Sequence, residues 1–139
     1  MSLKKSDGLN FPASDGNGGG ASGGGMSGLD IKTLTQSDSS ISVVLEKKFT
    51  NYMVKPSADG QVSIDASGMN LVEGKQYSFY LYIDMTSGSY DVTFDDTKIE
   101  WGNTSPTMTA MVMYEFSFET IDGGKTWVAN QMFSWLPKE

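Results

Sequence analysis

One stretch near the end of the chain limits the fold more than any other. In residues 112–119 one face carries Val112, Tyr114, Phe116 and Phe118, and the other carries Met113, Glu115, Ser117 and Glu119. A period of two of this kind is typical of a half-buried β-strand. The alternation breaks at Asp122-Gly123-Gly124 and resumes at Thr126-Trp127. Because glycine accepts the positive φ that a tight turn requires, Asp-Gly between two such runs is a strong hairpin signal. The sequence therefore predicts a β-hairpin here.

The rest of the chain from residue 29 onward has the same texture, with short apolar runs separated by glycine, proline and aspartate. The runs that predict strands are 41–46, 49–54, 61–65, 76–85, 90–94, 98–101 and 132–136. No segment shows a sustained period of 3.6 residues, which would indicate a helix. The pattern predicts an all-β chain, with a single small antiparallel sandwich or jelly-roll-like domain over residues 29–139.

The first 28 residues differ from this domain in composition, since they hold nine of the sixteen glycines. Such a stretch cannot offset its ordering entropy by burying apolar surface. We therefore predict an extended glycine-rich arm over residues 1–28. A short apolar patch, Leu9-Asn10-Phe11-Pro12, precedes most of the glycines and looks like a docking peptide on a tether. We expect this patch to anchor the arm on another protein.

Composition disfavours several classes of function. The chain has no cysteine, histidine or arginine, so thiol chemistry, the commonest general base and the usual bidentate phosphate clamp are missing. A net charge of −7 argues against binding nucleic acid, which needs a basic surface. No apolar run is long enough to span a bilayer, and the N-terminus lacks the apolar core of a secretory signal. We expect no cofactor, no membrane insertion and assembly in a cytoplasm.

Carboxylates are the remaining candidates for chemistry. A glycosidase pair would come from Asp91, Asp95, Asp96, Glu100 and Glu119, and a calcium site would come from the three aspartates of that set. Asp95-Asp96 stands where a turn favours aspartate, and the spacing of an EF-hand is absent. The sequence therefore favours turn formers and solvated side chains, with neither catalytic residues nor a metal site.

The run 76–85 predicts a strand with two unlike faces. Tyr77, Phe79, Leu81, Ile83 and Met85 form the core face, which leaves Tyr80 and Tyr82 on the other face. Exposed tyrosines of this kind suit a subunit interface, where Tyr is enriched, or a surface on which a sugar ring stacks; we favour the interface. Met111 and Met113 lie opposite the apolar face of the hairpin strand, which indicates a strand covered on both sides.

The hairpin residues Thr120, Asp122, Gly124, Thr126 and Trp127 resemble the Asp-box, S/T-x-D-x-G-x-T-W, of sialidases and other β-proteins. In that motif the aspartate braces the turn and the tryptophan packs beneath it, so the resemblance implies a structural role. Sialidase activity is disfavoured, because that fold repeats the box around a propeller and binds sialic acid through arginines. This chain has one copy of the box and no arginine.

A longer pattern resembles the C-terminal segment of many bacteriophage fibre and structural proteins. Those proteins commonly read W-x-x-G-x-x-P-T-x-T, then a strand, then DGGxTWYG. Here WGNTSPTMT (Trp101 to Thr109, with Pro106) precedes the hairpin that contains Asp122-Gly123-Gly124 and Thr126-Trp127. The glycine directly follows Trp101, and Val128-Ala129 replaces the usual ending. The resemblance covers roughly the last 40 of the 139 residues.

This resemblance implies a non-enzymatic virion protein, of which a head fibre or capsid decoration subunit is the type that best fits an arm plus one β-domain. It also implies a trimer. Together with the glycine-rich arm and its apolar patch, the resemblance leads us to expect that residues 1–28 hold this homotrimer on the major capsid protein or another virion protein, with a host-surface glycan as a candidate further partner. Two alternatives stay open: a tail-fibre or baseplate subunit, and a free carbohydrate-binding module with a flexible tail.

Overall fold

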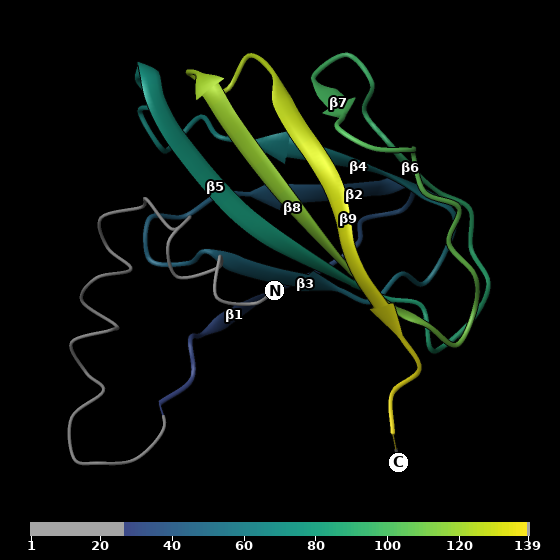
Figure 1. Cartoon of the computed structure of the whole chain (residues 1–139). Helices are drawn as coiled ribbons and strands as arrows, with labels where there is room; N and C mark the ends of the chain where they lie inside the picture. Colours follow the sequence, from purple (N-terminus) through teal and green to yellow (C-terminus); the bar gives the residue numbers. More distant parts are fainter. Residues whose placement is uncertain (1–26, 139) are drawn as a thin grey trace.

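The computed structural model describes residues 27–138, which form nine strands and no helix (Figure 1). The prediction of an all-β chain is confirmed for these residues. The strands are β1 (Ile31–Leu34), β2 (Ser40–Val44), β3 (Asn51–Val54), β4 (Gly60–Asp65), β5 (Glu73–Asp84), β6 (Val92–Phe94), β7 (Ile99–Trp101), β8 (Met113–Asp122) and β9 (Trp127–Trp135).

The strands form two sheets. The larger sheet has six strands in the order β1-β3-β5-β8-β9-β7, and the smaller has three in the order β2-β4-β6. Figure 1 shows the long strands β5, β8 and β9 crossing in front of β2 and β4. Buried side chains of both sheets belong to one hydrophobic cluster, so the core lies between the two sheets.

The first six strands alternate between the two sheets along the chain. β1, β3 and β5 are neighbours in the larger sheet, and β2, β4 and β6 are neighbours in the smaller one. Every pairing within these two sets is parallel. The prediction of an antiparallel domain is therefore wrong for this part. Each strand is followed by a crossing to the other sheet, so strands that are consecutive in sequence do not pair.

The predicted hairpin is confirmed as the antiparallel pair β8–β9. The two runs predicted at 126–127 and 132–136 fall in the single strand β9, except that Thr126 and Leu136 lie just outside its ends. A bulge separates them, because Glu115 pairs with Phe133 whereas the next residue, Phe116, pairs with Gln131. The extra residue reverses which side chains face the core. Phe133 and Trp135 consequently lie on the outer face of the larger sheet.

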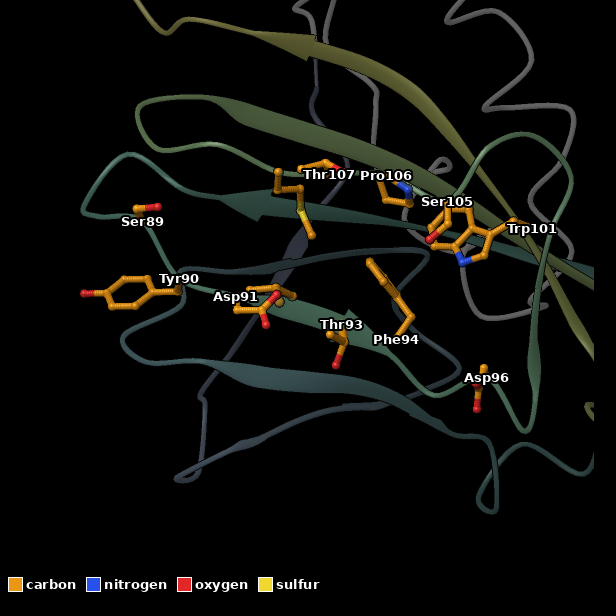
Figure 2. Close-up of a pocket in the computed structure, with 12 residues that line it drawn as sticks. Ser89, Tyr90, Asp91, Thr93, Phe94, Asp96, Trp101, Ser105, Pro106 and Thr107 are labelled. Carbon is orange, nitrogen blue, oxygen red and sulfur yellow. The ribbon is translucent and has the colours of Figure 1, made fainter.

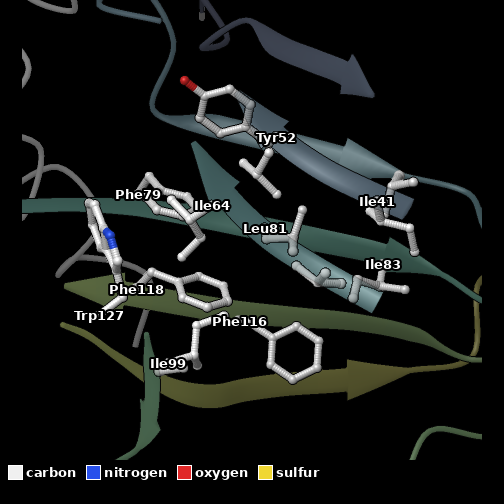
Figure 3. Packing of buried hydrophobic residues seen from close by; sticks show 14 of the residues in the cluster. Ile41, Tyr52, Ile64, Phe79, Leu81, Ile83, Ile99, Phe116, Phe118 and Trp127 are labelled. Carbon is white, nitrogen blue, oxygen red and sulfur yellow. The ribbon is translucent and has the colours of Figure 1, made fainter. Parts of the chain in front are cut away.

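The core is richest in aromatic side chains where the hairpin meets β5 (Figure 3). Phe79 stacks on Phe118 with ring centroids 4.9 Å apart, and Trp127 meets Phe79 edge-on at 5.2 Å. Tyr52 closes the β3 side of this cluster. The oxygen of its hydroxyl accepts a hydrogen bond from the Glu46 amide at 2.9 Å, and the same hydroxyl lies within donating distance of the carbonyls of Phe49 and Glu46, at 3.1 and 3.2 Å. Burial raises the pKa of Tyr52 to about 12.

The sequence pattern of the longest predicted strand is confirmed, since Phe79, Leu81 and Ile83 of β5 are fully buried in the core. Strand β1 is not among the predicted strands. Its residues, IKTL, are half-buried at best and lie at an edge of the larger sheet. A short edge strand lacks the alternation of large apolar residues that identifies the others.

Candidate functional site

A cleft of about 530 Å³ opens beside strand β6, one of the two edge strands of the smaller sheet (Figure 2). One wall is the segment 89–94, and the other is the loop that follows β7. Twelve residues line the cleft: Ser89, Tyr90, Asp91, Val92, Thr93, Phe94, Asp96, Trp101, Ser105, Pro106, Thr107 and Met108. The cleft therefore lies beside an edge strand of each sheet, β6 of the smaller and β7 of the larger.

Aromatic rings form the floor of the cleft. The Phe94 ring meets Trp101 at right angles, with centroids 4.9 Å apart, and each of the two rings also contacts Phe116 of the core. Both Phe94 and Trp101 remain partly exposed. Figure 2 shows these two side chains and Pro106 directed toward one another from different segments. Contacts with the core hold the rings in place, so the floor is preorganised.

Hydrogen bonds at both ends fix the loop wall of the cleft. The Gly102 amide donates to the Ala129 carbonyl at 2.8 Å, and the Thr109 amide donates to the Tyr114 hydroxyl at 2.7 Å. A Cβ atom at Gly102 would lie 2.5 Å from the Asn130 side-chain oxygen. The glycine that follows Trp101 therefore allows a close approach of the loop to β9.

Polar side chains form the rim. Asp91 is held by its backbone, since its amide donates to the Asp59 carboxylate at 2.8 Å and its carbonyl accepts from Gly60 at 3.0 Å. The carboxylate of Asp91 is left exposed at the rim, as is Asp96. Hydroxyl groups complete the rim, and none of the twelve lining residues is basic.

The candidate carboxylates of the sequence do not form one site. Asp91 and Asp96 both line the cleft, but Asp95 is engaged in a turn. Its carboxylate accepts hydrogen bonds from the Thr97 hydroxyl at 2.6 Å and the Thr97 amide at 3.0 Å, and these bonds lower the pKa of Asp95. Glu119 is bonded to Gln76, and Glu100 is exposed on β7. Among residues 27–138, acidic side chains do not gather in a group of three able to hold a metal ion.

The hairpin turn has the geometry that the Asp-box resemblance implies. The Asp122 carboxylate accepts hydrogen bonds from the Thr126 amide and the Thr120 hydroxyl, both at 2.9 Å. These bonds, chiefly that from the Thr126 amide, lower the pKa of Asp122. Gly123 and Gly124 have φ values of 73° and 88°. Trp127 packs beneath the turn at 1% exposure, so this motif belongs to the framework of the fold.

The outer face of the larger sheet differs from the prediction at Tyr80. We expected Tyr80 and Tyr82 to be exposed together, but Tyr80 is only 6% exposed. It is therefore not open for a sugar to stack on. Tyr82 is partly exposed, and its ring lies edge-on to Trp135 at 6.4 Å. An alternation pattern assigns a face to each residue, but it does not reveal how deeply that face is covered.

Beside Tyr82 lies a second surface, the C-terminal apolar patch, which we define by its apolar members Met111, Met113, Phe133, Trp135 and Leu136. Met111, Phe133 and Trp135 are 64%, 43% and 41% exposed. A hollow of about 620 Å³ at one end of the patch is also lined by Asp84, Thr86, Pro137 and Lys138. The expected cover over Met111 is not provided by residues 27–138, and it stays a prediction.

The structure thus divides the residues singled out in the sequence. Trp101 and Pro106 come together in the cleft, whereas the hairpin residues lie apart from it. Leu9, Asn10, Phe11 and Pro12 lie outside the described residues. Sequence reasoning missed that Phe94 contacts Trp101 and that Met108 lines the same cleft. One sequence signal could have indicated the cleft: each of the runs 90–94 and 98–101 ends in an aromatic residue that is directly followed by turn-forming residues.

Comparison with protein-family models, with curated proteins and with solved structures finds no match for this chain. A search of residues 27–138 for a helix able to span a bilayer also finds none.

Proposed function

We propose that this chain is a non-enzymatic structural protein of a bacteriophage particle, a head fibre or capsid decoration subunit. The arm of residues 1–28 anchors it on the major capsid protein or another virion protein, and the β-domain is displayed as part of a homotrimer. The sequence resemblance of residues 101–127 to phage fibre proteins supports the class of protein. The packing of two sheets over one core supports a sandwich-like domain rather than a jelly roll, since the smaller sheet is parallel.

The observation that carries the proposal furthest is the C-terminal apolar patch. The bulge in β9 turns Phe133 and Trp135 outward, and Trp135 lines the same hollow as Met111, which is also exposed. Contiguous exposed apolar surface marks interaction sites, and aromatic residues and methionine are enriched at the centres of interfaces. We therefore infer that copies of the chain contact one another through this patch, as subunits of an assembly do.

The arm supplies the second contact of the proposed mechanism, which is with the capsid. The short apolar segment of the arm, Leu9 to Pro12, docks in a groove or along a sheet edge of the capsid protein. Three arms per trimer then act at a high effective concentration, so that weak single contacts add up to stable attachment. Two tests follow, one for the location and one for the assembly.

Location is tested by immuno-gold electron microscopy of intact particles with an antibody against residues 29–139. We expect label over the head. Label confined to the tail would instead indicate a tail-fibre or baseplate subunit, and particles without label despite exposed epitopes would contradict a virion protein. Deletion of residues 1–28 is expected to abolish binding to particles; binding that persists would refute anchoring by the arm.

Assembly is tested by the double substitution Phe133→Ser and Trp135→Ser in the full chain. We expect light scattering coupled to size-exclusion chromatography to show a trimer for the natural sequence and a monomer for the variant. Val44→Ser is the matched control, because Val44 is similarly exposed but lies in the smaller sheet. A trimer that survives in the double variant would remove the patch from the interface.

A further inference from the structure

We propose that the cleft beside β6 binds an uncharged saccharide. This assignment concerns a ligand site on the β-domain, and it stands whether the domain sits on a head, on a tail or free in solution. The volume of about 530 Å³ falls in the range of small-molecule sites, which combine an apolar surface with a few convergent polar groups. The cleft has an apolar floor formed by the rings of Phe94 and Trp101, and its rim carries carboxylate and hydroxyl groups.

The floor suits the apolar face of a sugar ring. The C–H groups on one face of a pyranose pack against aromatic rings, whose faces carry partial negative charge. Trp101 and Phe94 supply such rings at the bottom of the cleft, and their contacts with Phe116 fix their orientation. Pro106 and Met108 extend this apolar surface on the loop wall.

The rim suits the hydroxyl groups of a sugar. A carboxylate accepts hydrogen bonds and has none to give, whereas every sugar hydroxyl can donate one. Asp91 and Asp96 therefore match a ligand rich in hydroxyl donors, and bonds to charged acceptors are the stronger ones. The same two carboxylates would repel sialic acid or a phosphorylated sugar, and no basic residue lines the cleft to offset that repulsion. The charge of the rim thus selects an uncharged ligand.

An extended peptide is a weaker fit for the same cleft. β6 is an edge strand of only three residues, Val92–Phe94, and peptides that add to a sheet edge gain affinity from main-chain hydrogen bonds. So short an edge offers few of these bonds, and short edge strands are a device by which proteins discourage added strands. The side chains of the cleft, rather than its backbone, carry its recognition chemistry.

The test is a titration of the full chain, labelled with nitrogen-15 and followed by nuclear magnetic resonance. The ligands are glucose, galactose, N-acetylglucosamine, their β-linked disaccharides and a sialylated trisaccharide. We expect one or more of the uncharged sugars to shift the signals of residues 90–94 and 105–108 and of the Trp101 indole, with a Kd near 1 mM. Asp91→Asn and Asp96→Asn should each raise that Kd roughly tenfold, since each removes a charged acceptor.

Asp30→Asn is the matched control. Asp30 is an exposed aspartate before β1, at the other side of the larger sheet from β7, and its substitution should leave the Kd unchanged. Three results would each overturn the proposal: no shift with any uncharged sugar at tens of millimolar, stronger binding of the sialylated ligand, or a synthetic peptide of residues 1–26 that binds at β6 in place of sugars. None of these results bears on labelling of particles, so failure here is distinct from failure of the proposed function.

Discussion

The hairpin β8–β9 and the sheet β2-β4-β6 are built in opposite ways. The hairpin joins neighbouring segments through one turn, whose Asp122 and Gly124 are visible in the sequence. The smaller sheet joins strands that never follow one another in the chain, because β3 and β5 intervene and belong to the other sheet. Local chemistry specifies the first, and only packing against the larger sheet brings the second together. Four predictions test this contrast, from the largest expected effect to the smallest.

The largest effect is expected at Trp127, where the hairpin meets the core. Trp127→Ala removes a 1% exposed indole that packs on Phe79. Substitutions of this kind cost about 3–5 kcal/mol in unfolding free energy. The measurement is urea denaturation followed by circular dichroism. Val128→Ala, at the exposed neighbour, should change stability by less than about 0.5 kcal/mol. Equal losses in the two variants would mean that the hairpin does not depend on its contact with β5.

The next effect concerns the turn itself. Gly124→Ala places a Cβ atom at a φ of 88° and 3.2 Å from the Leu71 side chain, and we expect a loss of about 1–2 kcal/mol from the left-handed conformation alone. Gly68→Ala is the matched control, since its added Cβ atom meets nothing within 4 Å. Thermal unfolding compares the two. A Gly124→Ala variant as stable as its control would show that the turn relaxes without cost.

The third prediction concerns the order of folding. Local contacts form faster than contacts between segments distant in sequence. Phe118→Leu in the hairpin should therefore slow folding, whereas Ile41→Val in β2, at a cost of about 0.5–1.5 kcal/mol, should mainly speed unfolding. Stopped-flow chevron plots measure both rates. A slower folding rate for Ile41→Val would place the smaller sheet in the folding nucleus, and the hairpin and the smaller sheet would then not differ in when they form.

The smallest effect is in the dependence on pH, where the two regions share one device. Asp122 lies in the hairpin, whereas Asp65 ends β4 and Asp95 directly follows β6 in the smaller sheet. The carboxylate of each accepts hydrogen bonds from a Ser or Thr that follows it in the chain, and these bonds lower the pKa of all three aspartates. A lowered folded pKa stabilises the protein above the unfolded value of about 3.9, and this contribution disappears as pH falls through the folded pKa.

Urea midpoints should therefore decrease as the pH is lowered from 5 to 3, and the decrease should be shallower for Asp122→Ala than for the natural sequence. Acid titration of the urea midpoint provides the measurement. Parallel curves for the two proteins would contradict a contribution of Asp122 to acid stability.

Sequence reasoning reached the local features of the fold and missed the long-range ones. The Asp-Gly turn and the alternation in β5 and β8 were enough to assign the hairpin and its core residues, since turn and alternation act over a few positions. The parallel pairing of β2 with β4 depends on crossings that leave no local pattern, and the usual expectation for short strands with tight turns is antiparallel. The chain bends at residues 57–59, for example, but the strands on either side of this bend, β3 and β4, belong to different sheets.

The candidate site shows the same division. Trp101 and Pro106 were singled out as parts of a motif, and Asp91 and Asp96 as members of a carboxylate set. That these four residues share one cleft follows from the position of β6 and β7 at the edges of two different sheets. Tyr80 failed for a related reason: alternation identifies the outer face but not its degree of burial, which is 6% exposure for this residue.

The winding of β1 to β6 also bears on how a protein of this kind changes length during evolution. Each pair of strands, such as β3 with β4, contributes one strand to each sheet and contacts the pairs before and after it. Duplication of one such unit would lengthen both sheets by a single strand spacing of about 4.8 Å and leave the hairpin and the cleft intact. In repeat architectures the stability of the whole is close to the sum of the stabilities of the units and of the interfaces between neighbouring units. A longer chain of this kind would therefore need no new core, because each added pair of strands would extend the existing core between the two sheets.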